Sequence, residues 1–386
     1  MEELVQKYAE KLVEQGLAES NDPLIGGLDA ELVWNRNHAD SEELEKVFNE
    51  LNINSLMYSR PAEPYRTIVD FLSNRAEDTI YPTDSEMRTF IHDLPVARNF
   101  TAREISGALK NRKSVIIPEK GIVSFGTVSP EQAFVTFSSV CFSCFVKFFA
   151  DYLTELHSGT LADTYREAFD KVVELLPKRE QITPELIQGP FYNEELVYQA
   201  LAQVGKLVVD RGLVDSFFGN VSLLYNDTLY ISQTSSSLDE LEGCIDPCQL
   251  DGSSCAGMTA STELPAHMRI VQESNVRSIL HGHPKFSVIM SMVCDSEKCD
   301  KRGLCHIRCP DRRFVRDVPI VPGEPGSGRY GLCNTLPPAV VNKPGAIVYG
   351  HGVFTTGEKD FVKPYKNLCA IEEMCREEYF NLAGSV

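Results

Sequence analysis

The sequence lacks an uninterrupted apolar stretch of the roughly 18–20 residues that a membrane-spanning helix requires. Its most apolar run, 133–152, is interrupted by Ser138, Lys147 and Asp151, as expected of a mostly buried helix. The N-terminus also lacks the basic, then apolar, then small-residue order of a signal peptide. We therefore expect no membrane partner and a cytoplasmic location.

Basic residues are scarce relative to acidic ones. The chain has 37 Lys and Arg against 55 Asp and Glu, a formal net charge of −18. Because affinity for nucleic acids comes largely from Lys and Arg displacing counterions from the phosphate backbone, we expect no nucleic-acid partner. The overall composition, with 43% hydrophobic and 24% charged residues, is typical of a globular protein.

A chain of 386 residues is longer than the roughly 250–300 at which one hydrophobic core stops growing, so we expect two domains. The charged, proline-containing segment 176–190 predicts a boundary near residue 187, which gives domains 1–187 and 188–386. In the second domain, apolar periodicity and turn residues predict helices over 193–211, 263–273 and 360–380, and strands over 221–224, 228–231 and 276–283.

Two segments of the first domain are similar to segments of the second, in the same order. The first match aligns FIHDLP (90–95) with ILHGHP (279–284), and places His92 opposite His281 and Leu94 opposite His283. The second match aligns VIIPEKGIVSFG (115–126) with AIVYGHGVFTTG (346–357), and places Lys120 opposite His351. Chance similarity of glycine-bounded strands is the alternative. Because an ammonium repels a divalent cation, we expect the first domain to be a degenerate copy that binds no metal.

Three histidines have the spacing of a metal site. His281 and His283 lie two residues apart at the end of an apolar strand, so their side chains point to the same face. His351, between two glycines at another strand end, supplies a third nitrogen. Three histidines leave a coordination position open, as in catalytic rather than structural sites. We expect Zn²⁺, or another divalent metal. The alternative is that these are ordinary loop histidines.

Four motifs in this order resemble the class II aldolase/adducin family: GNVS (219–222), STE (261–263), HGHP (281–284) and GHG (350–352). The resemblance covers about half of the chain. It implies a three-layer α/β/α domain around a mainly antiparallel sheet, with active sites near subunit contacts in homo-oligomers. In similar sugar-phosphate aldolases, the residues matching His281, His283 and His351 bind zinc, and the residue matching Glu263 moves a proton. Non-catalytic adducin domains lack such a complete set.

The resemblance also implies a phosphate site for a small, phosphorylated substrate. Similar aldolases hold the phosphate with the asparagine of the GNxS segment, a threonine-glycine turn and paired hydroxyls before the glutamate. The matching residues here are Asn220, Thr234, Ser235, Ser261 and Thr262. Ser235 stands where the family has glycine, and serine reaches positive φ less freely. The general acid is often a tyrosine from a neighbouring subunit, and Tyr330 is the candidate.

We therefore expect a metal-dependent lyase, an aldolase that cleaves or forms a carbon–carbon bond in a small, phosphorylated ketose through a metal-stabilised enediolate. An epimerase, a dehydratase or a decarboxylase of the same family would use nearly the same ligands. An adducin-like binding module is the non-catalytic alternative. We expect the first domain to take the place of a neighbouring subunit beside the active site.

A polar insert, 294–309, departs from the family pattern. It holds four cysteines, Cys294, Cys299, Cys305 and Cys309. Their spacing matches neither paired C-x₂-C knuckles nor a known iron–sulfur signature. A structural zinc, an iron–sulfur cluster and free thiols are all compatible with it, so a second metal and a redox or metal-sensing role remain alternatives. Cys141, Cys144, Cys369 and Cys375 lie in apolar patterns and are expected in the core.

Overall fold

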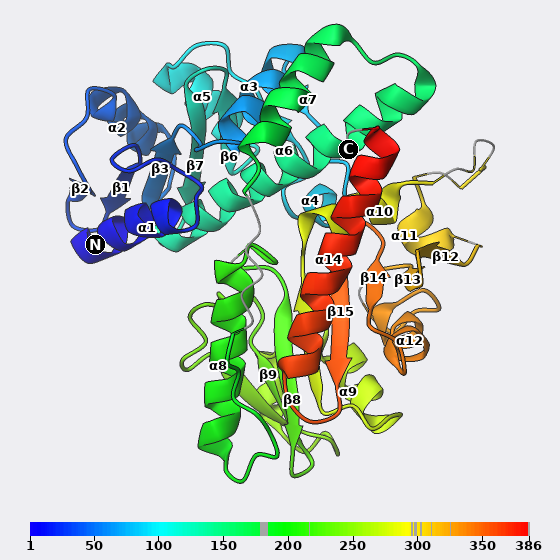
Figure 1. Cartoon of the computed structure of the whole chain (residues 1–386). Coiled ribbons are helices and arrows are strands. Elements are labelled where there is room, and N and C mark those ends of the chain that lie inside the picture. The colour runs from blue at the N-terminus through cyan, green and yellow to red at the C-terminus, as the bar shows by residue number, and fades with distance from the viewer. Residues whose placement is uncertain are drawn as a thin grey trace. The chain divides into compact units, whose positions relative to one another are not determined.

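The computed structural model divides the chain into two compact units, Met1–Glu180 and Gln181–Val386 (Figure 1). The division lies inside the predicted linker segment, somewhat before residue 187. The structure describes residues 1–177, 184–215, 217–294, 296, 299–301, 303–309, 311–324 and 326–384.

The N-terminal unit is a mixed α/β unit around a five-stranded sheet. Its helices are α1 (Glu2–Glu14), α2 (Ser41–Glu50), α3 (Tyr65–Arg75), α4 (Ser85–Phe90), α5 (Ala102–Leu109), α6 (Pro130–Ser158) and α7 (Asp163–Leu175). Its strands are β1 (Leu24–Leu28), β2 (Leu32–Trp34), β3 (Ser55–Ser59), β4 (Thr79–Ile80), β5 (Leu94–Pro95), β6 (Ser114–Ile117) and β7 (Gly121–Gly126). The sheet has the order β2-β1-β3-β7-β6 with antiparallel pairs throughout, and β4 pairs with β5 outside it.

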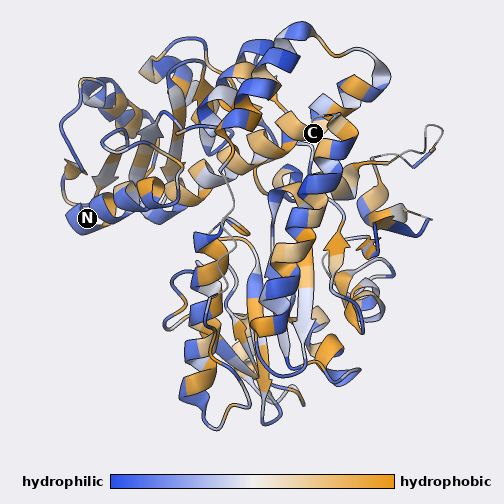
Figure 2. Cartoon of the chain, in the orientation of Figure 1, coloured by the Kyte–Doolittle hydropathy of each residue, from blue (hydrophilic) through white to orange (hydrophobic). Residues whose placement is uncertain are grey.

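Helix α6 forms much of the core of the N-terminal unit. Figure 2 colours much of it as hydrophobic, and Phe134, Phe137, Phe148 and Phe149 are fully buried. Among the described helices, it is the one long and apolar enough to cross a membrane, yet 94% of its most apolar window is buried inside the protein. This is the burial of a core helix.

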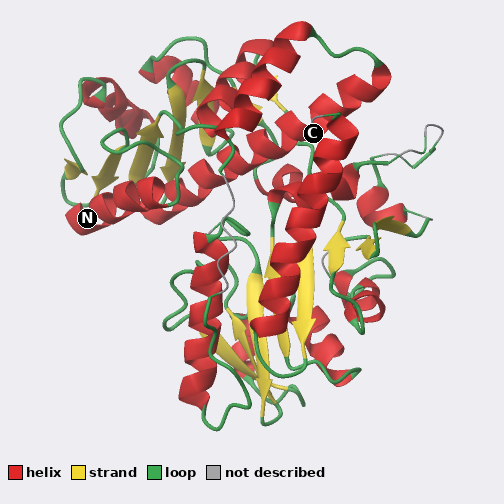
Figure 3. Cartoon of the chain, in the orientation of Figure 1, coloured by secondary structure: helices red, strands yellow, loops and turns green. Residues whose placement is uncertain are grey.

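The C-terminal unit is a larger α/β unit with an eight-stranded sheet (Figure 3). Its helices are α8 (Glu194–Asp210), the short 3₁₀ helix η1 (Cys255–Met258), α9 (Leu264–Gln272), α10 (Lys285–Met292), α11 (Cys305–Arg308), α12 (Leu332–Thr335), α13 (Pro337–Val340) and α14 (Val362–Ala383). Its strands are β8 (Asn220–Tyr225), β9 (Thr228–Ser232), β10 (Ile245–Gln249), β11 (Ser278–Gly282), β12 (Arg313–Val315), β13 (Val318–Val321), β14 (Ala346–Val348) and β15 (Gly352–Gly357).

Helices cover both faces of the C-terminal sheet. The strand order is β10-β9-β8-β11-β15-β14-β13-β12, and only the described pair β13–β14 is parallel. Ile279 and Phe354 face a core that includes α9, α12 and α13. The neighbouring Thr355, whose side chain points to the opposite face, donates to the carbonyl of Pro364 in α14 at 2.9 Å. The predicted α/β/α domain with a mainly antiparallel sheet is confirmed.

Local sequence signals account for the element ends around the site. Helix α8 begins where the Asn193 side chain accepts a hydrogen bond from the Leu196 amide, and Gly212 follows its end at φ +61°. Asn226 and Asp227 both have positive φ, the conformation of the tight turn that joins β8 to β9. The helices and strands predicted in this domain are all present, with ends shifted by a few residues.

The predicted alignment of His92 with His281 is wrong. His281 lies in β11, at the centre of the large sheet, whereas His92 precedes β5, which pairs with β4 outside the five-stranded sheet. Leu94, aligned with His283, is part of β5. The two segments have similar sequences, but they occupy different positions in the strand order of the two units.

A buried carboxylate fixes the start of α10, the helix that follows His283. Glu372 of α14, 1% exposed, accepts hydrogen bonds from the amides of Phe286 and Ser287 at 3.1 and 2.8 Å, and from the Ser287 hydroxyl at 2.8 Å. An anion at the first turn satisfies amides that have no partner within the helix and interacts favourably with the helix dipole.

We predict that Glu372→Ala lowers the free energy of unfolding by about 3 kcal/mol, because it leaves buried donors without an acceptor. Chemical denaturation followed by circular dichroism measures the change. The exposed neighbour provides the control: Glu373→Ala should change the free energy by less than about 0.5 kcal/mol. Equal effects of the two substitutions would contradict the assigned role.

Candidate metal centre and active site

Strand pairing brings three histidines together at one end of the C-terminal sheet. His281 lies in β11 and His283 just beyond it, while His351 lies in the turn between β14 and β15. Because β11 pairs with β15 in the register Gly282 to Val353, the end of β11 lies beside this turn. At Gly352 an added Cβ would stand 2.4 Å from the Gly282 carbonyl oxygen and 2.8 Å from the His281 ring. Glycine therefore permits the close approach of the rings.

The three imidazoles point their Nε2 atoms at one another. His281 Nε2 lies 3.1 Å from His283 Nε2 and 3.3 Å from His351 Nε2. Nitrogen atoms that bind one tetrahedral zinc at 2.0–2.1 Å stand about 3.3 Å apart. Within the described part of the chain, these residues form the one group of three or more His, Cys, Asp or Glu side chains with ligand atoms this close together.

Burial and tautomer prepare the rings for a cation. All three side chains are buried, and burial lowers the pKa of His281 and of His283 well below the ordinary value, so these two rings are neutral at neutral pH. His281 Nδ1 lies 3.1 Å from the carbonyl oxygen of Val353, which can only accept, so Nδ1 carries the proton. The lone pair of His281 Nε2 therefore faces the other two rings, as metal ligation requires.

Glu263 stands beside the histidines. It occupies the N-cap position of α9, is 7% exposed, and places its carboxylate oxygens 3.7 Å from His281 Nε2 and 3.5 Å from His351 Nε2. The Asn220 amide, at the start of β8 and opposite His281 in the strand register, donates to Glu263 Oε2 at 2.6 Å. The residues present thus fit a divalent cation: three ring nitrogens and one carboxylate converge on one small volume.

A family model matches most of the C-terminal unit. Residues 199–379 match the family model of the class II aldolase and adducin N-terminal domain. The C-terminal unit is a class II aldolase/adducin domain. A search of curated proteins finds no match to the chain.

Solved structures of aldolases are similar to about half of the chain. L-fuculose-1-phosphate aldolase from Thermus thermophilus is 18% identical, with 48% of this chain and 94% of that chain covered and a TM-score of 0.39. A sugar-phosphate aldolase from Thermotoga maritima is 17% identical, with 50% and 96% covered and a TM-score of 0.37. The N-terminal class II aldolase domain of a conserved protein from Thermoplasma acidophilum is 12% identical, with 50% and 99% covered and a TM-score of 0.35.

A buried histidine of the aldolase domain was not identified from the sequence. His267 lies one helical turn after Glu263, and its Nδ1 is 2.7 Å from the hydroxyl of Ser222 in the GNVS motif. Its ring packs edge-on against Phe354, which stacks on His281 at 3.8 Å between ring centroids. Burial lowers the pKa of His267 to about 4, so the ring is neutral. Its spacing of four residues from Glu263 is the signal that could have indicated it.

The residues predicted to bind phosphate are only partly brought together. Ser261 is buried, and its hydroxyl accepts from the Glu263 amide at 3.3 Å, whereas Thr262 is exposed. Thr234 is also exposed, and its amide donates to the Thr259 carbonyl at 2.9 Å. Ser235 has φ +61°, the left-handed conformation that glycine adopts more easily. Ser235 therefore adopts the backbone conformation that a glycine would favour at this position.

Tyr330 lies in the segment between β13 and α12 of the aldolase domain and is half-buried. Its ring contact is with Arg329, whose guanidinium carbon is 5.5 Å from the ring centroid. Among the described residues, no hydrogen bond joins Tyr330 to the three histidines or to Glu263 in this single chain.

The cysteines of the insert do not gather around one point. Cys294 is exposed, and Cys299, Cys305 and Cys309 are partly buried. Cys305 contacts the hydroxyl of Tyr349, and burial raises the pKa of that tyrosine to about 12. Among the described residues, no three of these sulfurs lie close enough together to share an ion. The described residues therefore do not support the predicted second metal site, and these four cysteines form no disulfide.

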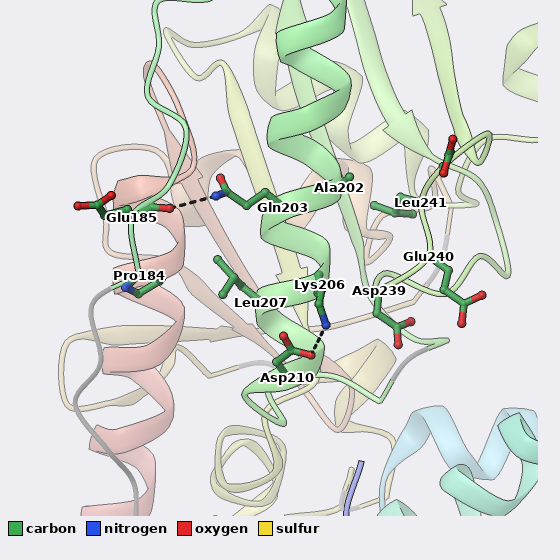
Figure 4. A pocket seen from close by; sticks show the side chains of 11 residues that line it. Pro184, Glu185, Ala202, Gln203, Lys206, Leu207, Asp210, Asp239, Glu240 and Leu241 are labelled. Atoms are coloured by element: carbon green, nitrogen blue, oxygen red, sulfur yellow. Dashed lines mark hydrogen bonds and ion pairs between the residues drawn. The ribbon is translucent and has the colours of Figure 1, made fainter. Parts of the chain in front are cut away.

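A surface depression of the aldolase domain lies away from these residues. It is bounded by α8 and the 239–242 segment, and Figure 4 shows the Lys206–Asp210 ion pair within it. None of the predicted site residues is part of its lining.

We predict that the thiols react in the order of their exposure. The exposed Cys255 and Cys294 should be alkylated first by iodoacetamide at pH 8. Cys144 and Cys375 should stay unmodified, because burial shields them and raises the pKa of each to about 12. Their thiolate fraction is then roughly 1,000-fold below that of an ordinary thiol.

Peptide mass spectrometry measures these rates before and after treatment with a chelator. If chelation released Cys294, Cys299, Cys305 and Cys309 from protection, a metal at the insert would be restored as the better interpretation.

Proposed function

We propose that the C-terminal unit is a metal-dependent carbon–carbon lyase that acts on a small, phosphorylated ketose. The observation that carries the proposal is the convergence of His281, His283 and His351 with the carboxylate of Glu263. A non-catalytic adducin-like module has no need of a buried carboxylate 3.5–3.7 Å from two ligand nitrogens.

The three histidines are proposed to hold the ion, with zinc as the first choice for three nitrogen ligands. A divalent ion held there would polarise a substrate carbonyl as a Lewis acid and would stabilise the negative charge that develops on the substrate. Val353 keeps the His281 tautomer that ligation needs, and Phe354 and Phe218 stack on the rings of His281 and His283 and exclude water.

Glu263 is proposed to move the proton at the reacting carbon. Its carboxylate is close enough to the histidines to reach a substrate held there, within about 3 Å or through one water. Asn220 holds one of its oxygens at 2.6 Å, which leaves the other oxygen to take the proton. Because Asn220 also has a second N–H, it can support Glu263 and contact a substrate phosphate with the same amide group.

The phosphate is proposed to lie near the start of α9. Ser261, Thr262 and the Thr234–Ser235 turn supply hydroxyl and amide donors there, and a helix N-terminus favours an anion. Tyr330 is kept as the proposed general acid, contributed by a neighbouring subunit of a homo-oligomer. Light scattering and the activity of Tyr330→Phe test these two parts of the proposal.

We predict that Glu263→Gln lowers kcat by about 10²–10⁴-fold, because an amide cannot accept the proton. The variant should keep its bound metal, since the three histidines are intact. Metal content by mass spectrometry and turnover of a panel of phosphorylated ketoses and hydroxy acids measure both outcomes. The products distinguish carbon–carbon cleavage from epimerisation, dehydration and decarboxylation.

A carboxylate on the same helix gives the control for this substitution. Glu273, which pairs with Arg269 at 2.7 Å, lies at the other end of α9, and Glu273→Gln should leave kcat unchanged. Full activity of Glu263→Gln, or loss of metal from it, would refute the assigned role.

We predict that Asn220→Ala lowers kcat about 10–100-fold, because Glu263 loses the hydrogen bond that orients it. It should also raise KM more for a phosphorylated ketose than for the unphosphorylated one. Thr262→Ala, which removes an exposed hydroxyl, should raise KM for the phosphorylated substrate and leave kcat unchanged. Steady-state kinetics on both substrates separates these effects. An unchanged kcat in Asn220→Ala would exclude the orienting role.

A further inference from the structure

The N-terminal sheet has the same strand order as the middle of the C-terminal sheet. In chain order, β1, β2, β3, β6 and β7 correspond to β8, β9, β11, β14 and β15, and both sets have the first, third and last of these strands side by side. All five strands are antiparallel to their neighbours within each set. A helix precedes each set, and a long helix follows it.

The same hydrogen bonds recur at matching register positions. Ser55 pairs with Gly126 as Ser278 pairs with Gly357, and the two serine hydroxyls donate to the carbonyls of Ser129 and Asp360, at 2.7 and 2.6 Å. Further along, Ser124 donates to the Ala133 carbonyl at 2.8 Å as Thr355 donates to that of Pro364 at 2.9 Å. The preceding helices end alike, at Gly16 (φ +65°) and Gly212 (φ +61°).

This register also gives FIHDLP its proper counterpart. FIHDLP (90–95) corresponds to FVRDVP (314–319), because Val96 bridges Ile116 in parallel as Ile320 bridges Ile347. His92 and Arg316, at the matching position of the two segments, both have positive φ, +62° and +50°. The segment thus matches the edge of the large sheet and not the strand of the histidines.

The matched register places a different residue at each position of the metal site. Tyr58 corresponds to His281, Arg60 to His283, Lys120 to His351 and Asp40 to Glu263. Asp40 precedes Tyr58 by as many residues as Glu263 precedes His281, and both acids stand at a helix N-cap with closely similar φ and ψ, −83° and −4° against −89° and 1°. Glu119, before Lys120, has φ +62°, and Gly350, before His351, has φ +59°.

In the N-terminal unit, side-chain contacts connect the end of β3 to the β6–β7 turn. In the C-terminal unit, the histidines would connect the end of β11 to the β14–β15 turn through an ion. Arg60 donates to Asp70 of α3 at 3.2 Å, and the other oxygen of Asp70 accepts from the Glu119 amide at 2.8 Å. The Tyr58 hydroxyl donates to the Lys120 carbonyl at 3.2 Å. Burial, with Asp40 nearby, raises the pKa of Tyr58 to about 12, so its hydroxyl remains a donor.

We propose that the N-terminal unit is a second copy of the aldolase fold in which the Arg60–Asp70 ion pair and the Tyr58 hydroxyl replace the metal ion. The guanidinium is a cation built into the chain, and together with the Lys120 ammonium it disfavours a divalent ion at this site. The unit therefore keeps the join between the end of β3 and the β6–β7 turn without any cofactor. The whole chain then carries one metal ion.

Restoring the histidines tests this correspondence. Tyr58→His, Arg60→His and Lys120→His are combined in the full chain with His283→Ala, which removes the metal site of the C-terminal unit. The expected metal content rises from none in His283→Ala alone to one Zn²⁺ or Co²⁺ per chain. The matched control combines Leu94→His and Lys120→His with the native His92, the set aligned with the three histidines by sequence alone, and should gain no metal.

A second measurement uses the unmodified protein. Hydrogen exchange read by peptide should become faster in 278–284 and 349–353 after chelation, and stay unchanged in 55–61 and 118–122. Arg60→Gln should accelerate exchange in 118–122 by about two- to fivefold, as expected for a partly exposed ion pair. The site of the C-terminal unit should be unaffected by it.

Two results would overturn the proposal: a folded triple-histidine variant that gains no metal, or chelation that accelerates exchange in 118–122 of the wild-type chain. These outcomes are distinct from failure of the proposed function. A wild-type chain that binds no metal would refute the enzyme site, whereas a wild-type chain with one ion whose histidine variant gains none would refute only the second copy.

Discussion

The antiparallel pairing of β11 with β15 is the constraint on which the functional site depends. It places the end of one strand, which carries His281 and His283, beside the turn that precedes the other strand, which carries His351. A shift of the register by one residue would turn His281 and His283 to the opposite face of the sheet. Gly352 belongs to the same constraint, because a side chain there would collide with the Gly282 carbonyl and the His281 ring.

Electrostatics explains why this arrangement favours a cation. Two of the three buried rings are held neutral by burial, and the hydrogen bond from His281 Nδ1 to Val353 directs a nitrogen lone pair toward the other rings. Lone pairs at such short distances repel unless a proton or a metal ion lies between them. The Glu263 carboxylate adds negative charge at the same place, and a buried carboxylate is itself costly without a positive partner.

The sequence was sufficient to predict that the three histidines and Glu263 lie close together, because each motif lies where a strand or helix ends. The fold of the C-terminal domain was implied by the resemblance of the four motifs to a known family. It was less informative about contacts that depend on tertiary structure. His267 and Glu372 lie on helices as single polar residues, and only packing shows that they contact Ser222 and the start of α10. The cysteine spacing could not show whether three of the described sulfurs of the insert come close enough to share an ion.

The misplaced alignment of His92 has a similar cause. FIHDLP was aligned with the strand of His281 because both contain a histidine. In the proposed correspondence, the bridge between Val96 and Ile116 and the positive φ of His92 align FIHDLP instead with the edge segment that carries Arg316. Register is a property of two paired strands, so the sequence of one segment alone contains little information about it. Lys120, by contrast, keeps its alignment with His351 in the proposed correspondence, because the flanking glycines Gly121 and Gly126 are each required by close backbone contacts.

The proposed metal ion of the C-terminal unit and the Arg60–Asp70 ion pair of the N-terminal unit each connect a strand end to a neighbouring turn, but with different physical consequences. A metal ion stabilises a fold by an amount that grows with its free concentration, so a site that depends on it is coupled to metal supply. An Arg–Asp pair has no such dependence, and its partly exposed position limits its strength to about 1 kcal/mol or less. An ion pair can hold a turn in place, but it offers no open coordination position to a substrate. Within one chain, the proposed metal-bound connection is therefore suited to catalysis, and the ion-paired connection is suited to holding the backbone in place.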